Sequence, residues 1–290
     1  MFKGAFTALV TPFSGGQIDV QALRDHVDFQ IEKGIDGLVP CGTTGEASTL
    51  SHDEHIEVVR ITVEQTAGRV PVIAGSGSNS TAEALELTRR VKEVGADACL
   101  MITPYYNKPT QEGLFQHFST VADKVDIPIV LYNVPGRTGI NMLPETVARL
   151  ASIPNIIGLK DATADLKQAS YTRQLTPEDF VILSGEDALV YPLMAVGGSG
   201  VICVTSNILP GEMAQLCRRF LTGDFSGAAE LHHRLLPMCD ALFVETNPIP
   251  VKAALSMMGH IENELRLPLV PVSEKGAEKV RAALRQFGLI

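Results

Sequence analysis

Ile156-Ile157-Gly158-Leu159-Lys160-Asp161 is an apolar stretch that carries a lysine, and it predicts a short buried strand. Pro154 and Asn155 precede the stretch, so a turn is expected immediately before it. Placing an ammonium group in a buried strand has a large desolvation cost, which favours the neutral amine. A neutral amine in a dry pocket is what Schiff-base formation with a carbonyl substrate requires.

Lys160 also has a simpler interpretation, in which it lies near the end of the strand and reaches water or a structural ion pair. Asp161 is not the expected partner, because adjacent residues of a strand point to opposite faces. The other lysines lie in polar or helical stretches. Lys252 has apolar neighbours, but Pro248 and Pro250 mark the opening of a helix there, so Lys160 is the unusual lysine of this chain.

Short stretches rich in β-branched residues recur along the chain and predict seven further strands, at residues 6–10, 37–41, 70–74, 98–103, 127–132, 180–183 and 200–205. Segments with helical period lie between most of them, for example residues 20–33 and 82–94. Ser51-x-x-Glu54 and Ser80-x-x-Glu83 are predicted capping boxes at helix starts. Near-continuous apolar strands that alternate with amphipathic helices indicate a parallel sheet covered by helices.

Eight such units favour a closed (β/α)8 TIM barrel over an open sheet. The segments after residue 210 predict helices at 212–221, 226–245, 251–258 and 274–287. We therefore expect an α/β protein with a catalytic barrel over residues 1–224 and a helical C-terminal region over residues 225–290.

The composition is that of a compact, water-soluble protein, with 45% hydrophobic and 20% charged residues. The net charge of −9 argues against a nucleic-acid partner, and the lack of a long apolar run argues against a membrane span. The N-terminus lacks a basic segment followed by a cleavable apolar stretch, which predicts a cytoplasmic protein. The five cysteines show no metal-binding spacing, so reduced thiols are expected.

Polar residues gather where several of the predicted strands end, which is the face of a barrel that carries the chemistry. These segments are residues 42–46 (GTTGE), 103–107 (TPYYN), 132–138 (YNVPGRT) and 184–187 (SGED). Gly197-Gly198-Ser199-Gly200 precedes a strand instead, and therefore predicts a helix stop and a tight turn rather than a phosphate-binding loop.

Each of these groups has a chemical and an ordinary interpretation. The N–H groups and hydroxyls of Thr43 and Thr44 suit a small carboxylate, or they simply form a hydrogen-bonded turn. Tyr132 can relay protons or satisfy a buried carbonyl, and Arg137 can clamp a carboxylate or remain solvated. Cys41 precedes a glycine turn and is a weaker candidate nucleophile, because no histidine lies near it in sequence.

Three segments carry a family resemblance, namely residues 42–46 (GTTGE), 132–138 (YNVPGRT) and 158–163 (GLKDAT). The chain resembles the dihydrodipicolinate synthase / N-acetylneuraminate lyase superfamily of class I aldolases along essentially its whole length. Within that superfamily, Arg137 and the GTTGE segment resemble the branch that condenses pyruvate with L-aspartate 4-semialdehyde.

The resemblance implies a lyase of diaminopimelate and lysine biosynthesis in which Lys160 forms an imine with pyruvate. Thr43 and Thr44 would then hold the pyruvate carboxylate, and Gly185 and Ile202 would line the pocket. Tyr132, Thr43 and Tyr106 match the proton relay of the family, whose second tyrosine comes from a neighbouring subunit. Arg137 matches the residue that binds the semialdehyde carboxylate. The resemblance implies no metal and no organic cofactor.

The resemblance also implies a homo-oligomer, as a dimer or a dimer of dimers, and an effector site for L-lysine. His52 and His55, taken alone, suggest a metal-binding pair or a solvated helical turn. In lysine-inhibited members of the family the matching residues line the effector site at a dimer interface: Ser48, His52, His55, Asn79, Glu83 and Tyr105.

Two other functions are compatible with this scaffold. One is a different pyruvate-dependent aldolase, such as one acting on 2-keto-3-deoxy-sugar acids, against which Arg137 argues. The other is a catalytically silent pyruvate-binding or regulatory protein, and the joint presence of Lys160, Tyr132, Thr43 and Tyr106 argues against that.

Overall fold

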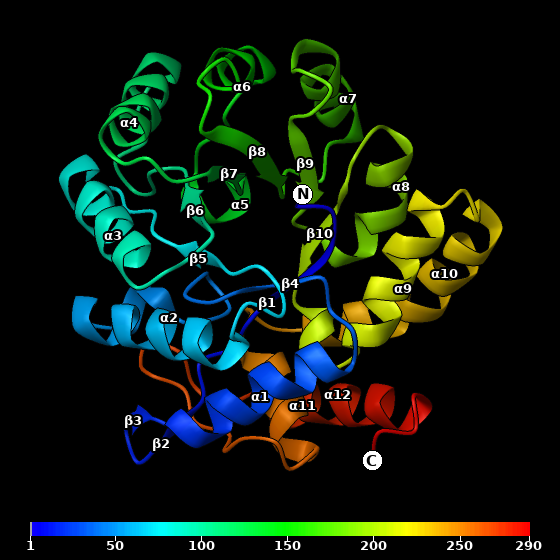
Figure 1. The fold of residues 1–290 in the computed structure, drawn as a ribbon. Coiled ribbons are helices and arrows are strands. Elements are labelled where there is room, and N and C mark those ends of the chain that lie inside the picture. The colour runs from blue at the N-terminus through cyan, green and yellow to red at the C-terminus, as the bar shows by residue number, and fades with distance from the viewer. Residues whose placement is uncertain (1) are drawn as a thin grey trace.

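The computed structural model describes residues 2–290, and Met1, the first residue of the predicted barrel, lies outside the described residues. Eight parallel strands form a ring in the order β4-β1-β10-β9-β8-β7-β6-β5 (Figure 1). A parallel bridge between Leu38 and Val72 closes the ring between β4 and β5. The strands are β1 (Gly4–Ala8), β4 (Gly37–Val39), β5 (Ile73–Gly75), β6 (Ala98–Ile102), β7 (Ile129–Asn133), β8 (Ile156–Asp161), β9 (Val181–Ser184) and β10 (Gly200–Cys203).

Helices surround this ring, as the alternating pattern predicts (Figure 1). They are α1 (Val20–Glu32), α2 (His52–Thr66), α3 (Thr81–Glu93), α4 (Gln111–Lys124), α6 (Pro144–Leu150), α7 (Leu166–Leu175), α8 (Val190–Ala195) and α9 (Pro210–Leu221). Short helical turns follow several strands: η1 (Ala47–Thr49), α5 (Pro135–Thr138), η2 (Asp187–Leu189) and η3 (Thr205–Asn207). The predicted (β/α)8 barrel is confirmed.

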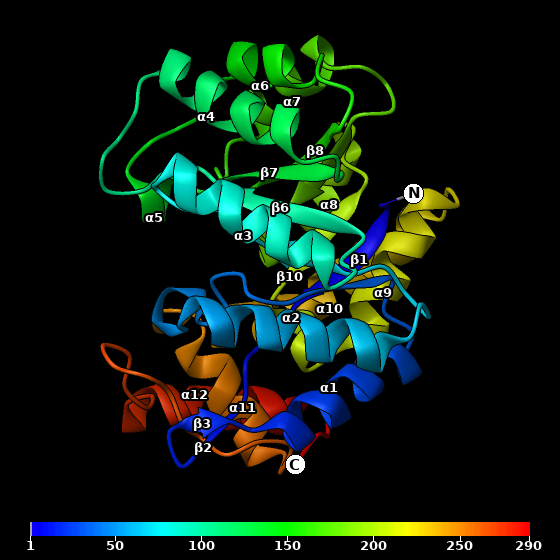
Figure 2. The same ribbon diagram turned by 60° about the vertical axis from the view of Figure 1, so that its left-hand side comes forward.

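Three further helices complete the C-terminal part: α10 (Phe225–Leu242), α11 (Ile249–Met257) and α12 (Glu274–Gln286). Figure 2 shows α11 and α12 beside α1 and a small antiparallel hairpin of β2 (Phe13–Ser14) and β3 (Gln17–Ile18). One hydrophobic cluster runs from Val201 of β10 to Leu284 of α12, so these helices share a core with the barrel. The boundary between residues 224 and 225 stays a prediction. Within residues 2–290, no helix has both the length and the apolar character needed to cross a bilayer.

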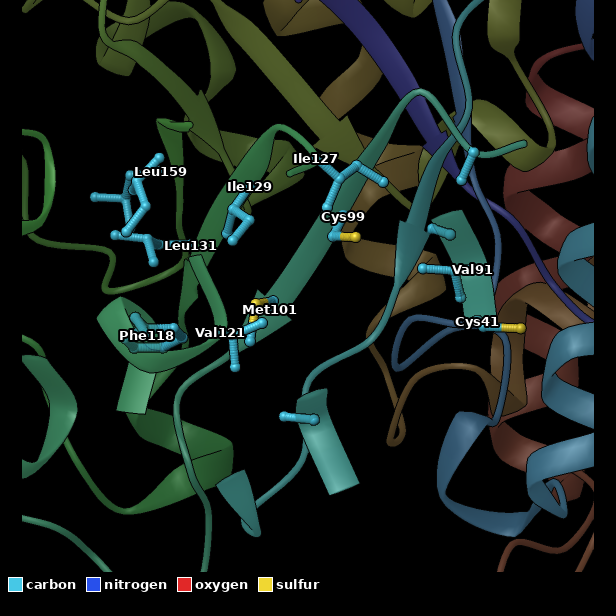
Figure 3. Close-up of a cluster of buried hydrophobic side chains, with 14 of the residues drawn as sticks. Cys41, Val91, Cys99, Met101, Phe118, Val121, Ile127, Ile129, Leu131 and Leu159 are labelled. Carbon is cyan, nitrogen blue, oxygen red and sulfur yellow. The ribbon is translucent and has the colours of Figure 1, made fainter. Parts of the chain in front are cut away.

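The strands bury both faces, which explains their near-continuous apolar sequences. One face packs on the surrounding helices: Met101, Leu131 and Leu159 point toward Phe118 and Val121 of α4 in Figure 3. The other face fills the barrel interior with a separate cluster that includes Tyr132 and Ile202. Because strand residues alternate, Lys160 lies on the face opposite to that of Leu159 and points into the barrel.

Candidate active site

Lys160 is buried inside the barrel, with 7% of its surface exposed. Its strand register places it beside Tyr132 of β7 and Leu183 of β9. The Nζ atom lies 4.4 Å from the centre of the Tyr132 ring. Among residues 2–290, no carboxylate lies within 4.0 Å of this amine, so the interpretation as a structural ion pair is wrong. Asp161 faces away, and its Oδ1 accepts from the backbone N–H and the hydroxyl of Thr163.

A cavity of about 50 Å³ opens beside Lys160 at the C-terminal ends of the strands. It brings together the predicted catalytic and substrate-binding residues from five strand ends: Thr43, Thr44, Tyr132, Arg137, Lys160, Gly185 and Ile202. Tyr106 is the exception, because it lies on the loop after β6 with 89% of its surface exposed. The role of Tyr106 in a neighbouring subunit stays a prediction.

The GTTGE loop is held from several sides. The Glu46 N–H donates to the Thr43 carbonyl at 3.1 Å, which closes the turn. The Thr11 hydroxyl donates to the Gly45 carbonyl at 2.7 Å, and Asn247 Nδ2 donates to the Thr44 hydroxyl at 3.0 Å. These bonds fix the backbone of Thr43 and Thr44 at the rim of the cavity, as a binding site for a small carboxylate requires.

Lys252 is more deeply buried than Lys160, so the prediction that it is an ordinary lysine is wrong. It is 0% exposed, and its Nζ lies 2.6 Å from Glu46 Oε1 and donates to the Thr11 carbonyl at 2.9 Å. Burial lowers the pKa of Lys252, and the Glu46 carboxylate opposes that shift. Burial alone therefore does not identify the nucleophile. Lys160 differs because it lines the cavity and has no carboxylate partner among the described residues.

Arg137 lies on the one-turn helix α5 rather than on the predicted loop. Its Nη2 donates to the Asn247 carbonyl at 3.2 Å, while the Asn247 side chain binds Thr44. Asn247 thus connects the two predicted carboxylate-binding groups, although it lies 110 residues from Arg137 and 203 from Thr44 in the chain. Sequence reasoning missed it, because no local pattern marks contacts over such separations.

Gly185 leaves room for the lysine side chain. A Cβ atom at this position would lie 3.1 Å from Lys160 Cε and 2.7 Å from the Ala162 Cβ. The Gly185 N–H donates to the Asp161 carbonyl at 2.7 Å, which holds the strand end β9 against β8. A side chain here would therefore clash with Ala162 and crowd Lys160, so the glycine keeps space for the lysine side chain.

Cys41 is not suited to act as a nucleophile. It is buried, and burial raises the pKa of its thiol well above the ordinary value. Its Sγ donates to the backbone carbonyl of His55 at 3.4 Å. The other cysteines are also free and buried, as predicted.

A second cavity, of about 440 Å³, adjoins the same loop and is lined by Thr43, Tyr132 and Arg137 on one side. Five of the six predicted effector residues line its other side: Ser48, His52, His55, Glu83 and Tyr105. Asn79 is not among its lining residues, and its carbonyl accepts from Asn107 Nδ2 at 2.8 Å.

Three residues near this second cavity, namely Glu83, Ser80 and His55, make contacts that differ from those predicted. Glu83 forms an ion pair with His52 at 3.0 Å and accepts from the Ser78 hydroxyl. The Ser80 capping box is therefore only half formed: Ser80 accepts from the Glu83 N–H, but the Glu83 carboxylate lies elsewhere. His55 is buried with its Nε2 2.7 Å from the Gly75 carbonyl, so the interpretation of both histidines as a solvated turn is wrong for His55.

The site therefore combines a (β/α)8 barrel, a buried strand lysine, a facing tyrosine and the GTTGE loop at one rim. The dihydrodipicolinate synthetase family model matches residues 1–287, and the chain belongs to this family.

Individual relatives agree over the full length. The 4-hydroxy-tetrahydrodipicolinate synthase of Nitratidesulfovibrio vulgaris (strain Miyazaki F) is 56% identical over 100% of this chain and 99% of its own. The crystal structure of dihydrodipicolinate synthase from Acinetobacter baumannii, complexed with pyruvate, is 45% identical and covers 100% of both chains with a TM-score of 0.98. The enzyme from Cyanidioschyzon merolae with lysine bound is 41% identical and covers 100% of this chain and 99% of its own, with a TM-score of 0.97.

These relatives are named for the enzyme of the predicted branch. The predicted family and the predicted activity, that of a 4-hydroxy-tetrahydrodipicolinate synthase, are thereby confirmed. The alternative of a 2-keto-3-deoxy-sugar-acid aldolase is not favoured.

Proposed function

We propose that this chain condenses pyruvate with L-aspartate 4-semialdehyde through an imine on Lys160 and forms 4-hydroxy-tetrahydrodipicolinate. The observation that carries the proposal is the buried amine of Lys160, which lines a cavity with Tyr132, Thr43 and Thr44 and, in the part of the chain that the structure describes, has no carboxylate within ion-pair distance. The pyruvate complex of the Acinetobacter baumannii relative supports the first substrate.

The chemistry follows from these positions. Lys160 attacks the pyruvate ketone while the Thr43 and Thr44 N–H groups hold the carboxylate, and water leaves to give the imine. Tyr132, which faces the lysine, and the Thr43 hydroxyl move protons to and from the reacting oxygen and nitrogen. Loss of a methyl proton then gives an enamine that adds to the aldehyde. The protonated imine of Lys160 is the electron sink, so the reaction needs no metal or organic cofactor.

The choice of acceptor aldehyde tests this function in the wild-type enzyme. With pyruvate present, we expect efficient turnover of L-aspartate 4-semialdehyde and poor turnover of N-acetylmannosamine and glyceraldehyde. Pyruvate consumption measured with each aldehyde separates the synthase function from the 2-keto-3-deoxy-sugar-acid aldolase function. Equal turnover of a sugar aldehyde would favour the other aldolase function.

Arg137→Ala is expected to raise the KM for the semialdehyde more than the KM for pyruvate. A guanidinium binds a carboxylate through two parallel hydrogen bonds, and Arg137 is proposed to make this contact with the second substrate. Loss of such a charge-assisted contact raises KM by roughly 10- to 100-fold. Steady-state kinetics with each substrate varied in turn measure the two KM values. An equal rise in both would contradict the proposed contact between Arg137 and the semialdehyde.

We propose a cytoplasmic homotetramer in which each dimer completes its own active sites. Tyr106 carries its phenol at the surface, 89% exposed, while the neighbouring Tyr105 lines the second cavity. A second copy placed on this surface would bring its Tyr106 to the Lys160 cavity. The relay of Tyr132, Thr43 and Tyr106 would then span two subunits.

We also propose that free L-lysine binds in the second cavity and inhibits the enzyme. The lysine-bound relative from Cyanidioschyzon merolae supports a lysine site in this family. Glu83 is partly exposed and offers a carboxylate to the ammonium, and Tyr105 offers a phenol to the carboxylate.

Glu83→Ala is expected to weaken inhibition by L-lysine strongly while leaving uninhibited turnover nearly unchanged. The substitution removes the proposed partner of the lysine ammonium, and Glu83 does not line the Lys160 cavity. Inhibition curves and calorimetry on both proteins measure the effect. If millimolar L-lysine neither binds nor slows the wild-type enzyme, the six residues are only polar groups of an interface.

A further inference from the structure

Glu186 is a carboxylate in the Lys160 cavity that the proposed mechanism does not use. It follows Gly185 at the end of β9 and lines the same cavity as Lys160, Tyr132 and Arg137. Its backbone is fixed, because the Ser184 hydroxyl donates to the Glu186 carbonyl at 2.8 Å and accepts from its N–H at 3.2 Å. Within residues 2–290, no hydrogen bond or ion pair occupies its side chain.

The position of Glu186 complements the second substrate. L-aspartate 4-semialdehyde carries an aldehyde, a carboxylate and an ammonium group. The first two have proposed partners, in the enamine on Lys160 and in Arg137. The ammonium would enter a partly closed cavity, where an unpaired charge is costly. Glu186 is a carboxylate on that cavity, and the positive charges of both Lys160 and Arg137 act on it.

We propose that Glu186 binds the ammonium group of this second substrate and accepts the proton that the group must lose before it displaces Lys160. The inference rests on the proposed function and extends it to the third group of the aldehyde substrate. Asp187, the neighbouring carboxylate, cannot take this role, because it accepts hydrogen bonds from the N–H groups of Val204 and Thr205 and is fully enclosed.

The proton balance of the step is simple. The ammonium gives one proton to the Glu186 carboxylate, which leaves a neutral amine and a neutral carboxylic acid. The amine nitrogen forms a bond to the imine carbon, and one of its protons passes to Nζ. The bond between this carbon and Nζ then breaks, which leaves a cyclic iminium and a free Lys160 amine. Burial and the Asp187 charge raise the pKa of Glu186, which favours its protonation, whereas the charges of Lys160 and Arg137 act in the opposite direction.

Glu186→Gln tests the role, because it removes the charge and keeps the size. We expect kcat/KM for the semialdehyde to fall by roughly 10- to 100-fold, as loss of a charged hydrogen bond implies. Borohydride trapping of pyruvate on Lys160 should stay at the wild-type level. Succinate 4-semialdehyde has the same aldehyde and carboxylate but no ammonium, so its inhibition constant should change little.

Two further variants serve as controls for Glu186→Gln. Glu178→Gln makes the same change on an exposed loop and should leave every parameter unchanged. Glu186→Asp keeps the charge and should recover part of the lost kcat/KM. An equal loss of affinity for both semialdehydes, or wild-type kinetics in Glu186→Gln, would overturn the role of Glu186 alone. A wild-type enzyme that neither traps pyruvate nor consumes the semialdehyde would overturn the proposed function itself.

Discussion

Lys160→Ala is expected to abolish borohydride trapping of pyruvate and to lower turnover by several orders of magnitude. Among residues 2–290, the substitution removes the only amine that lines the Lys160 cavity, and with it the covalent route through the imine and the enamine. Neither the neighbouring Tyr132 nor the GTTGE loop can replace the lysine as the nucleophile. Mass spectrometry of the trapped wild-type enzyme should place the added pyruvate mass on the peptide that contains Lys160.

Two other lysines serve as controls for this result. Lys167→Ala changes an exposed lysine of α7 and should leave both trapping and turnover intact. Lys252 is buried, but its amine is held by Glu46 and the Thr11 carbonyl, so it should carry no label. Label on Lys252, or spread over several surface lysines, would show that Lys160 is not the nucleophile.

The barrel could be predicted because its strands are buried on both faces and therefore carry continuous apolar sequences. The strand ends were less predictable. β5 begins at Ile73, whereas the sequence places its start at residue 70. The Pro71 carbonyl accepts from the Leu38 N–H, but a proline has no N–H to donate, and the ring closes there through one bridge instead of a full ladder.

The hairpin of β2 and β3 was missed although the sequence holds a signal for it. Gly15 and Gly16 lie between Ser14 and Gln17, and both have positive φ, at 58° and 81°. Two consecutive glycines between short extended segments are typical of a two-residue hairpin turn.

The candidate site was predicted where its residues are marked by local pattern, and missed where they depend on distant contacts. Lys160 stands out because its own strand is apolar. Lys252 does not, because its burial comes from α11 packing beneath the GTTGE loop, more than 200 residues away in the chain. Asn247 likewise depends on distant contacts, because the segment before α11 reaches the cavity only in the folded chain, whereas the SGED segment already placed Glu186 at that rim.

Glu46→Gln is expected to destabilise the fold strongly. Glu46 and Lys252 form an ion pair with side-chain exposures of 1% and 0%, and the second Glu46 oxygen accepts from the Arg266 N–H at 3.1 Å. Neutralising one partner leaves the other charge buried and unpaired, which costs about 3–5 kcal/mol. Because burial already lowers the pKa of Lys252, the lysine should lose its proton more readily in the variant, which limits the loss.

Urea unfolding at one protein concentration measures the loss in free energy of unfolding. Glu112→Gln serves as the control variant. Glu112 pairs with Arg149 at 2.9 Å on the surface, with exposures of 57% and 48%, so the same substitution there should change stability little. The double variant Glu46→Gln, Lys252→Met removes both charges and should regain much of the lost stability, because no buried charge is left unpaired. If Glu46→Gln proves as stable as Glu112→Gln, the ion pair of Glu46 and Lys252 does not hold the GTTGE loop to α11. The loop then depends on Thr11 and Asn247 instead.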